Sequence, residues 1–162
     1  MKLIPLTQGQ FAKVDDDMYD SLIKHKWMAQ YSPITKTYYA TRNGSRKNGI
    51  RNKIIRMHRM IINVEDGKIV DHRDHDTLNN QVTNLRPCSY SENMANSRVL
   101  AGKSGYRGVY PKGSRWSSKI VVNGVFIYLG QFKCKHEAAK EWNIISLWHH
   151  GEFAYQNIIK ED

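Results

Sequence analysis

Short runs of alternating apolar and polar residues occupy the first third of the chain. "KLIPL" and "FAKV" flank a turn at Gln8-Gly9 and predict a hairpin over residues 2–14. "DDDMYDSLIKHKW" predicts a short helix, for which Asp15 to Asp17 supply capping oxygens. "WMAQY" and "TYYATR" predict a second hairpin, which turns at residues 32–36. The first third is therefore expected to be rich in strands.

The middle of the chain has a less regular pattern. "IIRMHRMII" is apolar without a clear period, and it indicates either a buried strand or a short helix. "GKIVDH" predicts a strand, residues 73–82 a polar loop, "TNLRPC" a second strand and "SYSENMANSRVL" a helix. These elements form a strand, loop, strand and helix unit.

The last third predicts a three-stranded sheet and one helix. Asn123-Gly124 lies between two apolar runs and is a strong hairpin signal. The helix places Ala138, Trp142 and Ile145 on one face and ends at Gly151. The other face of the sheet stays open, where basic and aromatic side chains could enter a DNA groove. The predicted strands are "YRGVYP", "RWSSKIVV" and "VFIYLGQF", and the helix is "KHEAAKEWNIISLWHHGEF".

The distribution of charge indicates what kind of partner the protein binds. The chain has 162 residues, a formal net charge of +10 and only two cysteines. Residues 22–64 and 97–136 contain no Asp or Glu, so two basic spans favour a polyanionic partner, with nucleic acid ahead of anionic lipid. The cysteines support neither a disulfide framework nor a four-cysteine zinc site. With no apolar run near the length of a membrane span, we expect a soluble protein in the cytoplasm.

An acidic island lies between the two basic spans. A metal ion would explain why a protein that attracts phosphate also places carboxylates together, and a solvated acidic loop is the simpler alternative. The island consists of Glu65, Asp66, Asp71, Asp74 and Asp76.

The residues at the end of "GKIVDH" suit phosphodiester hydrolysis. His72 has an unperturbed pKa near neutrality and could deprotonate water, and Asp71 offers a hard oxygen ligand for Mg²⁺. The two can share a site only where the strand ends, because neighbours on a regular strand point to opposite faces. Asn93 and Asn96 lie on one face of the following helix, and the amide oxygen of Asn93 could be a second ligand.

Asp71-His72, "LNN" at residues 78–80, "NLR" at residues 84–86 and "SENMAN" at residues 91–96 resemble the HNH endonucleases. The resemblance is to the phage and intron-encoded homing subgroup, in which Asn replaces the last His, and it covers about residues 1–98. It implies a ββα-metal (His-Me) finger that cleaves DNA in a phage-infected or bacterial cell with one divalent cation, Mg²⁺ or else Mn²⁺. His72 would be the general base, Asp71 and Asn93 would hold the metal, and Asn84 would brace the loop that presents His72.

"YRGVY", "RWSSKI", "GVFIYLGQF" and "EAAKEW" resemble the AP2 DNA-binding domain. The resemblance implies a sheet in the major groove, with Arg107, Arg115, Lys119 and Tyr128 as candidates for DNA contact. Tyr110 and Phe126 stand where plant transcription factors of this family use arginine, so their base-reading code should not be transferred.

We therefore expect an α+β protein that is a metal-dependent endonuclease acting on double-stranded DNA. One finger per chain favours a monomer that nicks one strand, although a dimer could cut both. The expected regions are an N-terminal β-rich DNA-contacting region (1–52), the finger (53–98), a linker (99–104) and the AP2-like domain (105–158). Further DNA contacts are expected from Arg42, Arg46, Lys47, Arg51, Arg56 and Arg59.

Alternatives remain at three places. His58 lies in an apolar run, where a core histidine is commoner than a catalytic one. His72 and His75 could form a zinc site with Cys88, although this spacing is poor for zinc. The whole protein could also be a non-catalytic DNA-binding regulator with an inactive or structural finger.

Overall fold

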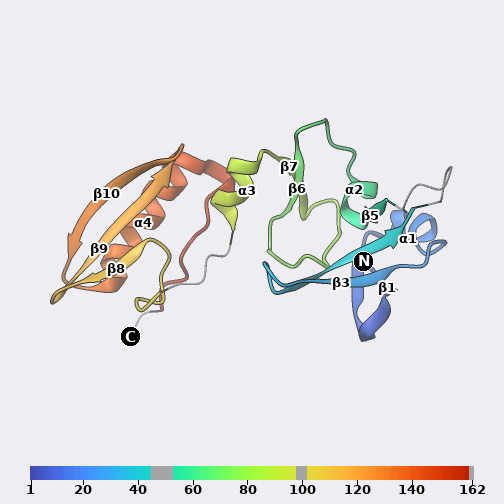
Figure 1. Ribbon diagram of the computed structural model, residues 1–162, viewed down its shortest axis with the longest axis horizontal. Coiled ribbons are helices and arrows are strands. Elements are labelled where there is room, and N and C mark those ends of the chain that lie inside the picture. Colours follow the sequence, from blue (N-terminus) through green and yellow to red (C-terminus); the bar gives the residue numbers. More distant parts are fainter. Residues whose placement is uncertain (45–52, 98–101, 161–162) are drawn as a thin grey trace. The chain divides into compact units, whose positions relative to one another are not determined.

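The computed structural model describes residues 1–44, 53–97 and 102–160, and the chain divides into two compact units, Met1–Ser89 and Tyr90–Asp162. Figure 1 shows the helices and strands of both units. Both combine helices with small antiparallel sheets, as the sequence predicted. The predicted domain boundaries stay predictions, and the division assigns α3 (Tyr90–Asn96) to the C-terminal unit.

The N-terminal unit begins with the two predicted hairpins. β1 (Lys2–Pro5) pairs with β2 (Phe11–Val14) across a short 3-10 turn at Thr7–Gly9. After α1 (Asp16–Leu22), β3 (Met28–Ser32) pairs with β4 (Thr37–Asn43), and β4 pairs with β5 (Ile54–Arg56). Both hairpin predictions are confirmed.

Side chains from the strands, from both helices and from the segment before β3 build the core of the unit. Trp27 is anchored in this core because its Nε1 donates to the carbonyl oxygen of Leu22 at 2.8 Å. The apolar side chains that pack together are Ile4, Ala12, Val14, Leu22, Trp27, Ala40 and Met57.

The apolar run at residues 54–62, for which the sequence allowed a strand or a short helix, forms a strand followed by a helix. Ile54–Arg56 is strand β5, and α2 (Met57–Ile61) follows at once, with Met57 and His58 buried. β6 (Ile69–His72) then pairs antiparallel with β7 (Leu85–Cys88). The long loop between β6 and β7 is therefore held at both ends by the same ladder.

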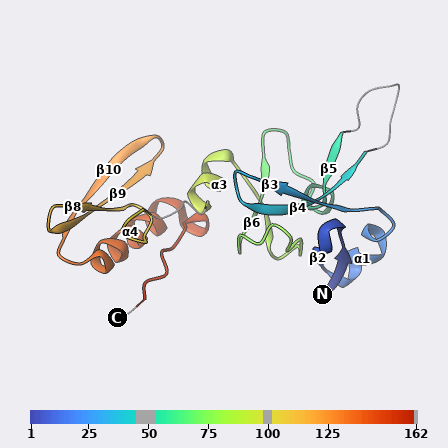
Figure 2. The ribbon, with the colours of Figure 1, turned by 60° about the horizontal axis from the view of Figure 1, so that its bottom comes forward.

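The C-terminal unit contains the predicted sheet and its helix. β8 (Val109–Lys112), β9 (Arg115–Val122) and β10 (Val125–Phe132) are antiparallel, with β9 in the centre. α4 (Lys135–His150) covers one face (Figure 2), and it buries Ala138, Ala139 and Trp142. The helix ends at Gly151, whose φ of 52° favours glycine, as expected. Within the described ranges, no helix is long and apolar enough to span a membrane.

Candidate active site

Asp71 and His72 are the last two residues of β6, where the sequence placed the candidate site. Across the ladder, Asp71 lies opposite Arg86 and His72 lies opposite Leu85. Both side chains are buried, with 7% of Asp71 and 5% of His72 exposed. The strand ends after His72, as the sequence predicted, although Asp71 and His72 are both still paired in the ladder.

The His72 ring has an unsatisfied nitrogen. Its Nε2 is buried and has no hydrogen-bond partner among the described residues. Burial lowers the pKa of His72, and the hydrogen bond with Asn80 and the charge of Asp71 oppose this effect. A buried polar atom without a partner is rare in folded proteins and calls for an explanation, such as a chemical role.

Two aromatic side chains pack around this imidazole. The rings of His58 and His72 have centroids 5.1 Å apart, and Tyr39 lies 6.1 Å from His58 and 6.4 Å from His72. Burial lowers the pKa of His58 to about 3, with the nearby His72 as the next cause. His58 is therefore a neutral buried histidine, but it lies beside the candidate base, which its apolar sequence context did not reveal.

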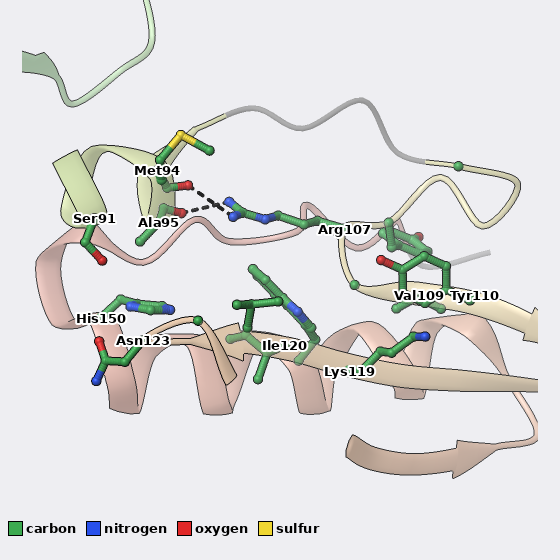
Figure 3. Close-up of a pocket in the computed structure, with 16 residues that line it drawn as sticks. Ser91, Met94, Ala95, Arg107, Val109, Tyr110, Lys119, Ile120, Asn123 and His150 are labelled. Carbon is green, nitrogen blue, oxygen red and sulfur yellow. Dashed lines mark hydrogen bonds between the residues drawn. The ribbon is translucent and has the colours of Figure 1, made fainter. Parts of the chain in front are cut away.

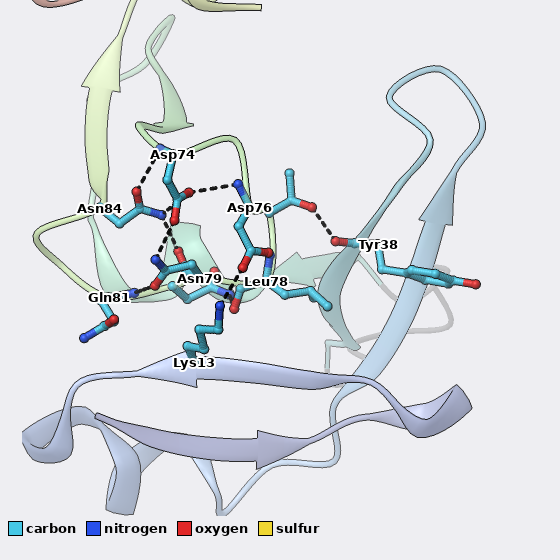
Figure 4. A network of polar contacts seen from close by, with 10 residues as sticks. Lys13, Tyr38, Asp74, Asp76, Leu78, Asn79, Gln81 and Asn84 are labelled. Atoms are coloured by element: carbon cyan, nitrogen blue, oxygen red, sulfur yellow. Dashed lines mark hydrogen bonds and ion pairs between the residues drawn. The ribbon is translucent and has the colours of Figure 1, made fainter. Parts of the chain in front are cut away.

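Asn84 holds the loop that follows His72 (Figure 4). Its Nδ2 donates to Asp74 Oδ1 at 2.9 Å and to the Asn79 carbonyl at 2.8 Å, and its Oδ1 accepts from the Asp74 amide at 3.1 Å. The Asn84 carbonyl also accepts from the amide of Arg73 at 2.9 Å. One amide side chain thereby fixes both sides of the loop.

Asp74 and Asp76, two members of the acidic island, serve this loop. Burial alone would raise the pKa of Asp74, but hydrogen bonds from Asn79, the Asp76 amide and Asn84 outweigh it and lower the pKa. Asp76 Oδ1 accepts from the amide of Leu78 at 3.1 Å. Two carboxylates of the island thus stabilise the loop. This is close to the simpler interpretation of the island, an acidic loop, and not to a metal site.

The N-terminal hairpin supports the same loop. The Lys13 amide donates to Leu78 O and the Asn80 amide donates to Lys13 O, both at 2.8 Å, and Lys13 Nζ lies 2.9 Å from Asp76 Oδ2. Asp15 accepts from the Val82 amide at 2.7 Å. The prediction that Asp15 caps α1 through its side chain is wrong, because that carboxylate binds the loop instead.

Asp71 is held by a buried ion pair. Its Oδ2 accepts from Arg86 Nε at 2.9 Å and from Arg86 Nη2 at 2.8 Å. Arg86 belongs to the "NLR" motif, but no role could be predicted for it, because only the ladder register shows that it faces Asp71. A carboxylate oriented in this way suits a hard cation such as Mg²⁺, which often takes one or two protein oxygens and retains its waters.

Asn93, the other predicted metal ligand, is half-buried on α3 in the C-terminal unit. Its amide oxygen is also a hard donor, so both side chains fit the chemistry of Mg²⁺ or Mn²⁺. Within the described ranges, no group of three or more His, Cys, Asp or Glu residues could hold a metal ion. The alternative zinc site of His72, His75 and Cys88 is therefore not formed.

The open face of the C-terminal sheet carries the candidate DNA contacts. Lys119 pairs with Tyr128 and Arg115 with Lys112, and paired neighbours lie on the same face. Lys119 Nζ lies 4.8 Å from the centre of the Tyr110 ring. Tyr128 and Phe126 are 56% and 76% exposed. This face is basic and aromatic, and α4 leaves it uncovered.

The structure places the remaining predicted DNA contacts in different settings. Arg56 and Arg59 are exposed, and Arg56 lies over the Tyr39 ring at 5.5 Å. Arg42 is half-buried beside Trp27. Arg107 is also half-buried and donates to backbone carbonyls. Arg46, Lys47 and Arg51 lie outside the described residues.

Comparison with known proteins concerns the same segment of the sequence. Residues 63–95 match the HNH endonuclease family. The match begins after α2 and includes β6, its loop, β7 and most of α3. The chain is also 28% identical over 158 residues to an uncharacterized HNH endonuclease of Acanthamoeba polyphaga mimivirus, an alignment that covers 94% of this chain and 77% of the viral protein. The segment that contains Asp71, His72, Asn84 and Asn93 is therefore similar to an HNH nuclease domain.

Proposed function

We propose that the protein is a metal-dependent endonuclease of double-stranded DNA, with His72 as the general base. The observation that carries this proposal is the buried, unpartnered Nε2 of His72 next to Asp71, inside the segment that matches the HNH endonuclease family. A neutral imidazole can accept a proton from an attacking water molecule through a free ring nitrogen. Burial favours this neutral form because it lowers the pKa of His72.

Asp71 and Asn93 are the proposed ligands of one Mg²⁺ or Mn²⁺ ion. When bound, such an ion stabilises negative charge on the phosphate and the leaving oxygen. Arg86 would orient the Asp71 carboxylate through the two hydrogen bonds to Oδ2. Asn84 would keep the loop after His72 in place through its contacts with Asp74 and Asn79.

The open sheet of the C-terminal unit is the proposed anchor on DNA, in the manner of an AP2-like domain. Arg115 and Lys119 supply charge for phosphates, and Tyr110 and Tyr128 supply exposed aromatic surface on the same face. In the N-terminal unit, Arg56 and Arg59 are exposed and would add phosphate contacts.

A second function is favoured by one observation. Asp71 Oδ2 already accepts two hydrogen bonds from Arg86 in a buried pair, an arrangement that also suits a finger with a structural role. The chain would then be a DNA-binding regulator without cleavage activity.

The test is nicking of supercoiled plasmid by wild-type protein and by His72→Ala, with Mg²⁺ and with EDTA. We expect metal-dependent nicking by the wild type and a loss of about 10²–10⁴-fold in the variant, the usual range for a general base. DNA affinity in EDTA should stay within about two-fold, since the base adds little to phosphate binding. His149→Ala, an exposed histidine of α4, is the matched control and should nick normally. Unchanged nicking by His72→Ala would remove His72 from the mechanism, and binding without nicking by the wild type would favour the regulator.

A further inference from the structure

Arg107 is predicted from the sequence to touch DNA, but its guanidinium binds the end of a helix (Figure 3). Nη1 donates to Ala95 O at 2.7 Å and to Ser97 O at 2.9 Å, and Nη2 donates to Met94 O at 3.2 Å. The last carbonyls of a helix lack intrahelical partners and carry partial negative charge. Arg107 therefore caps the C-terminal end of α3.

Aromatic rings enclose the same guanidinium. Its central carbon lies 5.3 Å from the Trp142 ring and 5.5 Å from the Tyr155 ring. Burial lowers the pKa of Arg107, yet an arginine stays charged at neutral pH. The carbonyl oxygens and the ring faces compensate this charge in place of water.

The backbone of Arg107 is fixed as firmly as its side chain. Its amide donates to Asn157 Oδ1 at 2.7 Å, and Asn157 Nδ2 donates to Arg107 O at 3.1 Å. Asn157 is bound in turn by Asn143 of α4. The next residue, Gly108, has a φ of 77°, and a Cβ there would collide with Nε1 of Trp142. Arg107 thus connects α3 to α4: its side chain is fixed at the end of α3, and its backbone is fixed to α4 through Asn157.

We propose that Arg107 is a positioning residue for metal binding: it fixes α3 within the C-terminal unit and so sets the orientation of Asn93. This inference rests on the proposed function, because it gives Asn93 the role of a ligand. Asn93 is adjacent to Met94, one of the residues that Arg107 binds. The C-terminal unit, which carries the basic sheet, would then also orient the metal ligand Asn93. The cationic DNA contacts of that unit would be Arg115 and Lys119, and not Arg107.

The test compares Arg107→Ala and Arg107→Lys with the wild type in three measurements. These are the Mg²⁺ dependence of plasmid nicking at saturating DNA, Mn²⁺ affinity by electron paramagnetic resonance, and DNA affinity in EDTA as a function of salt. Lys140→Ala removes one charge from an exposed position of α4 and is the matched control. Circular dichroism and thermal unfolding report whether each variant is folded.

We expect Arg107→Ala to weaken metal affinity or nicking by about 10–100-fold, the usual effect of losing a residue that orients a ligand. Arg107→Lys should be intermediate because an ammonium group cannot reproduce the planar fork that spans these carbonyls. DNA affinity and its salt dependence should not change in either variant, and Lys140→Ala should match the wild type throughout.

Three results would overturn the assignment. One is unchanged metal dependence in a folded Arg107 variant, which would leave a structural role alone. Another is weaker DNA binding with a shallower salt dependence, which would make Arg107 a DNA contact as the sequence suggested. If Arg107→Ala does not fold, a normal Mn²⁺ affinity in Arg107→Lys would by itself overturn the assignment. Failure of the proposed function is distinct from these results, because the wild type itself would then not nick.

Discussion

The two units present their candidate functional residues in opposite ways. In the N-terminal unit, Asp71, His72, Asn84 and Arg86 are all buried, with between 4% and 7% of each residue exposed. On the C-terminal sheet, the candidate DNA contacts Arg115, Lys119 and Tyr128 are exposed. The first set is a group of buried polar residues, and the second is an exposed surface.

This difference sets how each unit should respond to substitution. A buried polar group is costly unless it is hydrogen-bonded, so removal of one of these buried residues affects folding and chemistry together. An exposed cation on a sheet contributes to binding by its charge and can be removed with little effect on stability. The comparison therefore predicts abrupt effects in the N-terminal unit and graded effects on the sheet.

The largest effect on stability is expected when Arg86 loses its charge. Arg86→Met keeps most of the side-chain volume but leaves the buried carboxylate of Asp71 without its partner, and it should lower the free energy of unfolding by about 3–5 kcal/mol. Urea denaturation of the full chain measures this. Asp71→Asn combined with Arg86→Met should be less destabilised than Arg86→Met alone, because no charge is then left unpaired. A loss below about 1 kcal/mol in Arg86→Met would show that the pair is not buried in solution.

A smaller effect is expected from acid. His58 has a pKa of about 3 in the folded chain and an ordinary value of 6.5, so the unfolded chain binds more protons between these pH values. The free energy of unfolding must then fall as the pH falls, by about 2 kcal/mol between pH 7 and pH 5 from His58 alone. His72, whose pKa is also lowered, acts in the same direction.

The variant His58→Leu identifies the source of this acid sensitivity. Urea denaturation at a series of pH values should show a shallower dependence on pH in His58→Leu than in the wild type, by about one proton below pH 6. Equal slopes would mean that His58 is accessible to protons in the folded chain and does not pack against His72 as described.

Local patterns predicted most of the secondary structure. The strands follow from alternating apolar positions, the β9–β10 turn from Asn123-Gly124, and the end of α4 from Gly151. The apolar run at residues 54–62 could not be assigned, since a three-residue strand followed by one helical turn has no single period.

Local sequence patterns could not predict contacts between residues that are far apart in the chain. Asp15 looked like a helix cap, but its carboxylate binds the amide of Val82, 67 residues away. Arg107 looked like one more cation of a basic sheet, but its guanidinium meets α3. In both cases the residue type and its neighbours fit a common local role, and the partner became visible only with the tertiary fold.

The smallest expected effect belongs to the exposed sheet. Arg115→Ala with Lys119→Ala should weaken DNA binding by roughly ten-fold and make the salt dependence of log Kd shallower by about 2, one for each phosphate that is no longer neutralised. Fluorescence anisotropy with labelled duplex DNA over a range of salt concentrations measures both quantities. Nicking at saturating DNA should be nearly unchanged, since neither side chain has a role in the proposed chemistry. Lys133→Ala with Lys140→Ala removes the same charge from exposed positions outside the sheet and should have a smaller effect on both quantities. If the two double variants behave alike, DNA binding depends on the total charge and not on the sheet. The sheet would then not be the DNA-binding surface, and the contrast with the buried residues would not hold.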